Sequence, residues 1–117
     1  MIIIAGTIDF ATPEARDACL EAAVPFQEST RTTEPGCLAY SFAADSGSPV
    51  RVQVFELWED EASLAAHFEH PNFLAMGQTL RGFERAGGST AKYRCDLTEP
   101  VRDSEGRARA DFFTAES

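Results

Sequence analysis

Apolar and polar positions follow two different periods along this chain, and the period changes mark the predicted elements. Near the N-terminus, most even positions from Ile2 to Phe10 are apolar, with Thr7 and Asp9 between them. A continuous apolar start of this kind predicts a strand that is covered on both faces.

A helix is predicted to begin at Thr12 and Pro13, because the hydroxyl can cap the first turn and proline has no N–H to leave unpaired at the first helical position. Pro25 predicts a bend in this helix but not its end. Apolar residues recur at three- and four-residue spacing, so one stripe along the helix faces a core. The small residues in this stripe allow the helix to pack closely on a sheet. The stripe consists of Ala15, Ala18, Cys19, Ala22 and Phe26.

The segments 37–44 and 50–58 alternate large and small or polar side chains and are separated by a turn-forming cluster at 45–49. This pattern predicts an antiparallel hairpin. In its second strand, one face carries Val52, Val54 and Trp58, and the other carries Phe55 and Leu57.

Two short helices are predicted next. Asp60 caps the first, in which Leu64 and Phe68 face inward, and His70 before Pro71 interrupts it because a residue before proline disfavours the helical conformation. The second carries apolar side chains at Phe73, Met76, Leu80 and Phe83.

The last predicted strand spans 91–97 and is set off by the pair Gly87 and Gly88. The complete order is βαββαβ with a split second helix, which predicts an α+β, ferredoxin-like fold with an antiparallel sheet for residues 1–97. Residues 98–117 form a polar tail that we expect to be partly disordered. The alternative is that Phe112 and Phe113 pack on a partner subunit.

Composition restricts the partners. The 117 residues suit one domain, and 19 acidic against 10 basic residues argue against nucleic acid binding. The apolar start is too short for a signal peptide or membrane span, so a cytoplasmic protein with no membrane partner is expected. Three scattered cysteines give neither a disulfide framework nor a zinc spacing with the two histidines, so no metal site is expected.

The run from Glu34 to Leu80 has a recognisable order: a Glu-Pro-Gly turn, a hairpin, a Trp-Glu-Asp junction at residues 58–60, and His67 before a Pro-Asn-Phe segment at residues 71–73. This order resembles the antibiotic biosynthesis monooxygenase family, which includes cofactor-independent quinol oxygenases. The resemblance implies two subunits pairing sheet to sheet into a dimeric α/β barrel. The sequence agrees, because the predicted helices can cover only one apolar sheet face.

The resemblance and the spacing together suggest a ligand cavity between sheet and helices. His67 is the candidate catalytic base, and Trp58 would form a wall of the cavity. The other candidate substrate-binding residues are Tyr40, Phe68 and Phe73.

Plainer interpretations of the same residues remain open. Trp58 could be a core residue, His67 a surface or capping histidine, and Tyr40 a half-buried aromatic with its hydroxyl in water. His70 is expected to cap the helix break. Glu56 shares the Trp58 face and would need a partner such as an arginine, for which Arg51, Arg81 and Arg94 are candidates.

No cofactor is expected. In the family's heme-degrading branch, a tryptophan and an axial histidine correspond to His67 and Gly77 here, so the resemblance implies that the iron ligand is missing. No glycine-rich dinucleotide motif occurs either.

The resulting hypothesis is a cofactor-independent monooxygenase that oxidises a quinol, phenol or polycyclic aromatic with dioxygen in an apolar cavity. The alternative is a non-catalytic dimeric barrel that binds a small hydrophobic ligand, because a fold does not fix a reaction.

Overall fold

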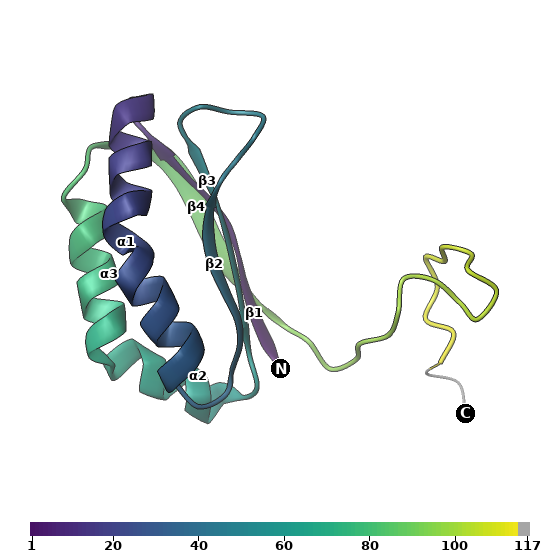
Figure 1. The fold of residues 1–117 in the computed structure, drawn as a ribbon. Helices are drawn as coiled ribbons and strands as arrows, with labels where there is room; N and C mark the ends of the chain where they lie inside the picture. The colour runs from purple at the N-terminus through teal and green to yellow at the C-terminus, as the bar shows by residue number, and fades with distance from the viewer. Residues whose placement is uncertain (115–117) are drawn as a thin grey trace.

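A four-stranded antiparallel sheet with helices on one face makes up the body of the protein (Figure 1). The computed structural model describes residues 1–114. The strands lie in the order β2-β3-β1-β4, which with the βαββαβ chain order confirms the ferredoxin-like α+β fold. The strands are β1 (Ile2–Phe10), β2 (Cys37–Ala44), β3 (Arg51–Trp58) and β4 (Arg85–Arg94).

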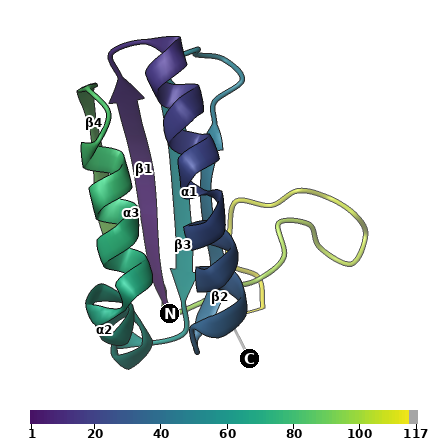
Figure 2. The same cartoon turned by 60° about the vertical axis from the view of Figure 1, so that its left-hand side comes forward.

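The helices are α1 (Pro13–Thr33), α2 (Glu61–Glu69) and α3 (Pro71–Arg81), and all lie on the same side of the sheet (Figure 2). The predicted caps are confirmed, since the side chain of Thr12 accepts from the backbone N–H of Ala15 and that of Asp60 from Ser63. Helix α1 continues through Pro25, as predicted. No helix within residues 1–114 is both long and apolar enough to cross a membrane.

The core lies between the helices and one sheet face. Because side chains alternate along a strand, Val52, Val54, Glu56 and Trp58 all face the helices, whereas Phe55 is on the open face and 42% exposed. Two clusters of buried apolar residues form this core. They are Ile8, Phe10, Cys19, Val52 and Val54, and then Ala23, Tyr40, Trp58, Leu64 and Met76.

The edge strand β2 is tied to α1 by one side-chain amide. Gln27 donates from Nε2 to the carbonyl of Phe42 and accepts from the Phe42 N–H at Oε1, at 3.0 and 2.9 Å. Unpaired edge groups can template association with another chain, so this pair protects part of β2.

The last strand differs from its prediction. It spans Arg85–Arg94 instead of 91–97, and Gly87 and Gly88, interpreted as a separator, pair within it with Asp9 and Ile8 of β1. The difference arises because glycine is common in turns, but inside a strand it also marks close backbone approach or irregular pairing. A register shift between Asp9 and Phe10 lies at this point.

Replacing Gly88 with alanine is expected to destabilise the protein by about 2 kcal/mol or more. Gly88 has φ of 111°, and a Cβ would lie 2.4 Å from the carbonyl oxygen of Thr7 and 2.7 Å from Cα of Ile8. Gly87→Ala is the matched control, because a Cβ there meets nothing within 4 Å. Urea denaturation measures both, and equal losses would contradict the assignment.

The described part of the tail leaves β4 and lies on the open side of the sheet (Figures 1 and 2). It has its own hydrogen bonds: the backbone N–H groups of Asp103 and Arg109 donate to the carbonyls of Arg107 and Val101, and the Glu99 carboxylate accepts from the backbone N–H groups of Phe113 and Thr114. Phe112 is 58% exposed. Positions 115–117 of the predicted tail lie outside the described residues.

Candidate functional site

A buried carboxylate joins α1, α2 and α3. Glu34 ends α1, and its Oε1 lies 2.8 Å from Nδ1 of His67 while its Oε2 accepts from Nδ2 of Asn72 at 3.1 Å. The His67 and Glu34 side chains are 1% and 3% exposed. Because an ionised carboxylate only accepts, Nδ1 of His67 carries the proton in this arrangement.

His70 lies beside this cluster and caps α3, as predicted. Its Nδ1 accepts from the backbone N–H of Asn72 at 3.0 Å. The same nitrogen is 3.8 Å from Oε2 of Glu34, but its lone pair is already used by the cap. His70 therefore has a structural role, and its contact with Glu34 is not a hydrogen bond.

His67 packs on Trp58, and Trp58 binds Glu56. The His67 and Trp58 rings lie 4.5 Å apart between centroids, and the indole Nε1 donates to Oε1 of Glu56 at 3.0 Å. Trp58 and Glu56 share one face of β3 because they are two residues apart. The order of contacts is therefore Glu34, His67, Trp58 and Glu56.

The pKa of the Glu56 carboxyl group is unusually high. Burial raises the pKa of Glu56 from 4.5 to about 7, the negative charge of Glu34 adds to this rise, and the hydrogen bond from Trp58 opposes it. The group is therefore partly protonated near neutral pH and can both take and return a proton.

Tyr40 is paired with Glu56 across β2 and β3 and is 3% exposed. Burial raises the pKa of its hydroxyl, and the charges of Glu56 and Glu34 raise it further. Tyr40 is therefore a neutral phenol with its ring 5.6 Å from that of His67. The alternative of a half-buried aromatic with its hydroxyl in water is wrong.

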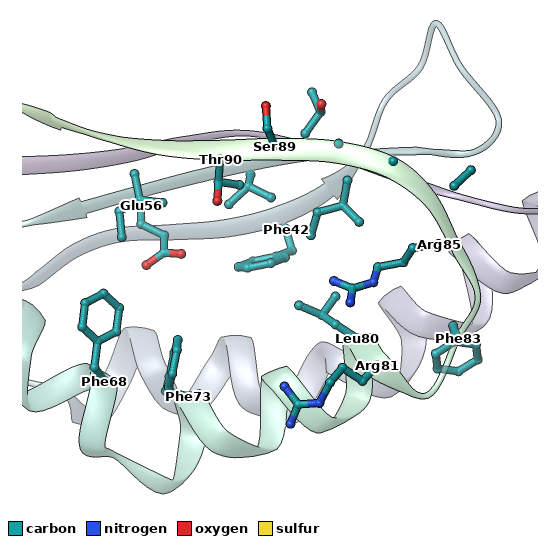
Figure 3. Close-up of a pocket in the computed structure, with 17 residues that line it drawn as sticks. Phe42, Glu56, Phe68, Phe73, Leu80, Arg81, Phe83, Arg85, Ser89 and Thr90 are labelled. Carbon is teal, nitrogen blue, oxygen red and sulfur yellow. The ribbon is translucent and has the colours of Figure 1, made fainter.

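A cavity of about 1000 Å³ opens beside this cluster, between α3 and the sheet (Figure 3). Glu56 points into it, and Phe42, Phe68, Phe73 and Leu80 supply apolar walls. The other side is formed by β4, which is exposed along its length. Apolar walls with a few converging polar side chains are typical of a small-molecule site.

The five residues selected from sequence fall into two layers. Phe68 and Phe73 line the cavity, whereas Trp58, Tyr40 and His67 do not. The His67 ring lies behind the two phenylalanines, with centroids 6.0 and 5.4 Å from theirs. The surface alternative for His67 is wrong, because its side chain is 1% exposed and the capping role belongs to His70.

The prediction that Glu56 has an arginine partner is wrong, since within residues 1–114 none of Arg51, Arg81 and Arg94 forms an ion pair with it. The hydrogen bond to Glu56 comes from Trp58, while Arg51 pairs with Asp9 and Arg94 with Asp96. An indole two residues along the same strand face satisfies the acid locally, so no distant cation is required.

Sequence reasoning missed Glu34, Asn72 and Arg85. Glu34 looked like part of a turn, and its histidine partner is 33 positions away. Its signal would have been an acid at a helix end followed by a chain reversal that buries it.

Within residues 1–114, no group of three or more histidine, cysteine or acidic side chains could hold a metal ion.

Stability should depend on Glu56 in a defined pH window. The folded-state pKa of about 7 exceeds the ordinary 4.5, so the unfolded chain ionises first and stability falls as pH rises from about 4.5 to about 7. The loss is about 3 kcal/mol above that window. Glu56→Gln keeps an acceptor for Trp58 but cannot ionise. The difference in stability between this variant and the wild type should therefore be about 3 kcal/mol more favourable to the variant at pH 8 than at pH 4.5.

Urea denaturation at both pH values measures this difference. Glu21→Gln, at an exposed position of α1, is the matched control. A wild type and a Glu56→Gln variant with the same pH dependence would show that Glu56 is not held in a buried, proton-retaining environment.

Comparison with known proteins places these features in a family. The family model for antibiotic biosynthesis monooxygenase matches residues 1–79. An uncharacterised protein of Synechocystis sp. is 35% identical over 72 residues, which are 62% of this chain and 48% of that protein. The chain spans about half the length of the curated relatives that it matches.

Solved structures share the fold. A candidate antibiotic biosynthesis monooxygenase from Deinococcus radiodurans superimposes with a TM-score of 0.76 at 20% identity, covering 88% of this chain and 100% of that one. SnoaB from Streptomyces nogalater, a cofactor-independent oxygenase, gives 0.62 at 13% identity and covers 85% and 96%. These similarities show the fold alone, but the family match extends over more than half of the sequence. The chain therefore belongs to the antibiotic biosynthesis monooxygenase family.

Proposed function

We propose that this protein is a cofactor-independent monooxygenase that oxidises a quinol, phenol or polycyclic aromatic with dioxygen. The observation that carries the proposal is the apolar cavity of about 1000 Å³ into which Glu56 projects, with a pKa of about 7. Family membership and the cofactor-independent oxygenase of the same fold add support.

The proposed reaction uses the substrate as its own reductant. Glu56 accepts the phenolic proton, and the resulting electron-rich anion passes an electron to dioxygen. The resulting substrate radical and superoxide combine at a ring carbon to form a peroxide, which takes back the proton held by Glu56. Cleavage of the O–O bond, with loss of the hydrogen on that carbon, releases water and leaves a carbonyl. One oxygen atom enters the product, the other leaves as water, and the substrate supplies both electrons and both hydrogens. The apolar walls hold the ring.

Glu56 is the proposed base because it lines the cavity, whereas His67 lies behind Phe68 and Phe73. The His67 Nδ1 is already bound to Glu34, and its ring packs on Trp58. In this proposal His67 holds the tryptophan that positions the carboxyl group. The assignment of His67 as the base stays a prediction that variants can separate from this one.

Oxygen uptake tests the proposed function directly. Purified wild type is incubated with a panel of quinols, naphthols and anthrones, and uptake is compared with buffer and with heat-denatured protein. Faster uptake, with one atom of labelled dioxygen in the product, supports the proposal. Uptake no faster than buffer over the whole panel, together with a rise in melting temperature on ligand addition, supports a ligand-binding barrel instead.

We further propose a homodimer through the open sheet face. Phe55 and Tyr93 on this face are 42% and 55% exposed, and an isolated subunit would leave these apolar groups in water. The tail lies on the same side of the sheet, where it could cross to the second copy (Figure 1).

Phe55→Glu is expected to convert a dimer into a folded monomer, because it adds a charge at the centre of the open face. Phe42→Glu is the matched comparison, since Phe42 packs against the core on the helix face and its replacement should unfold the subunit. Light scattering gives the mass, and circular dichroism gives the fold. A wild-type monomer at micromolar concentration, or a Phe55→Glu dimer, would contradict this interface.

A further inference from the structure

Two arginines of the cavity wall lack a partner. Arg81, at the end of α3, and Arg85, at the start of β4, both line the cavity. Within residues 1–114, neither forms an ion pair or a side-chain hydrogen bond, in a chain with 19 acidic residues. The other arginines donate to carboxylates or carbonyl oxygens. They are Arg16, Arg31, Arg51, Arg94, Arg102, Arg107 and Arg109.

The cavity therefore has charged as well as apolar walls. Figure 3 shows the Arg85 guanidinium beyond Phe42 from Glu56, and the Arg81 side chain along α3 with its guanidinium directed back toward Phe73. The Arg85 charge also acts on a core residue. Burial raises the pKa of the Cys19 thiol, and the positive charge of Arg85 opposes this rise. A ligand that fills this space meets the Glu56 carboxyl group and, apart from it, two cations.

Gly77 makes room for one of these cations. The Arg81 side chain folds back over the preceding turn of α3, so that a Cβ on Gly77 would lie 3.1 Å from its Nη1 and 3.7 Å from its Nη2. A methyl group there would require the guanidinium to move by a few tenths of an ångström. Gly77 thus leaves room for the observed position of Arg81.

We propose that the cavity binds an aromatic ligand that carries an anionic group, a carboxylate or a phosphate monoester, held by Arg81 and Arg85. The aromatic ring and the hydroxyl group directed at Glu56 rest on the function proposed above. The anionic group rests on the two guanidiniums, whose planar donors match carboxylate and phosphate oxygens. With a net charge of −9, the protein as a whole repels anions, so local cations are needed to retain one.

Binding measurements on three matched probes test this inference. The probes are a naphthol, a hydroxynaphthoate with its carboxylate on the ring opposite the hydroxyl, and the corresponding phosphate monoester. Titration calorimetry at neutral pH should give at least one anion a Kd roughly 10-fold or more below that of the naphthol, and added salt should reduce this preference. The carboxylate and phosphate probes distinguish the two sources of negative charge.

Variants then assign the preference to the two residues. Arg81→Gln and Arg85→Gln should each weaken binding of the anion by several-fold and leave the naphthol unchanged, and the double variant should bind all three probes alike. Gly77→Ala should weaken anion binding alone. Arg94→Gln is the matched control, because Arg94 is exposed like Arg81 and Arg85 but pairs with Asp96 and does not line the cavity.

Equal affinity for all three probes, no binding of any, or a preference that survives the double arginine variant would each overturn the inference. These results are separate from the oxygen test. If the wild type oxidises neutral quinols but does not prefer anions, the proposed function is supported and this inference is wrong. A wild type that prefers anions and consumes no oxygen keeps this inference and loses the oxygenase.

Discussion

Replacing Glu56 with glutamine is expected to slow oxygen consumption by about 10²-fold, the usual scale for loss of a general base. Glutamine keeps the shape of the side chain and an oxygen that can accept from Trp58 Nε1, so the cavity and the core should remain intact. Only the ability to take the phenolic proton is removed. Initial rates of oxygen uptake on the best substrate of the panel, with circular dichroism of both proteins, measure the effect.

The pH profile gives an independent measurement of the same group. Because the base must be ionised, kcat/KM of the wild type should rise with pH and level off above about 7, the pKa that burial gives Glu56. Trp58→Phe removes the hydrogen bond that lowers this pKa, so its profile should shift to higher pH and its rate should recover there. A merely structural tryptophan would lower the rate equally at every pH.

His67→Ala separates the two candidate bases. If Glu56 is the base, His67→Ala changes the rate through the position of Trp58 and retains a rising pH profile. If His67 is the base, His67→Ala loses about 10²-fold and Glu56→Gln retains most of its activity. Glu69→Gln, on the exposed surface of α2, is the control for an acidic residue outside the cavity.

Much of the fold could be predicted because its signals are local. The strands around the hairpin alternate with period two, and Thr12, Asp60 and His70 each mark a helix boundary by a side chain that caps a nearby N–H. The β4 strand could not be placed from such signals. Its glycines are there because the backbone of β1 approaches closely, which depends on a residue 80 positions away, Ile8 opposite Gly88.

The candidate site divides in the same way. The inward direction of Trp58 and His67 follows from strand and helix periods, so sequence alone could predict it. The acid that binds His67 belongs to the end of α1 and joins it only when α2 packs against that end. Arg81 and Arg85 both line the cavity because the chain reverses direction between α3 and β4. No periodic pattern in the sequence predicts where such a reversal places two side chains.

Replacing Glu34 with alanine is expected to destabilise the protein by about 3 kcal/mol or more. The change leaves the Nδ1–H of His67 without its carboxylate acceptor, and Nδ2 of Asn72 loses one of its two acceptors, in a region where His67 is 1% exposed. A buried donor without an acceptor costs about 1 to 3 kcal/mol, and the acceptor lost by Asn72 adds to this cost. Urea denaturation at neutral pH measures the loss, with Glu28→Ala on the exposed surface of α1 as the control.

A double-mutant cycle shows whether the loss belongs to the pair. His67→Ala removes the unpaired donor, so the double variant Glu34→Ala with His67→Ala should be more stable than the sum of the single losses predicts, by about 1 to 3 kcal/mol. The His67→Ala loss alone includes the contact with Trp58, which the cycle subtracts. Strict additivity would mean that Glu34 and His67 are not coupled. The first contact in the order Glu34, His67, Trp58 and Glu56 would then contribute no interaction energy.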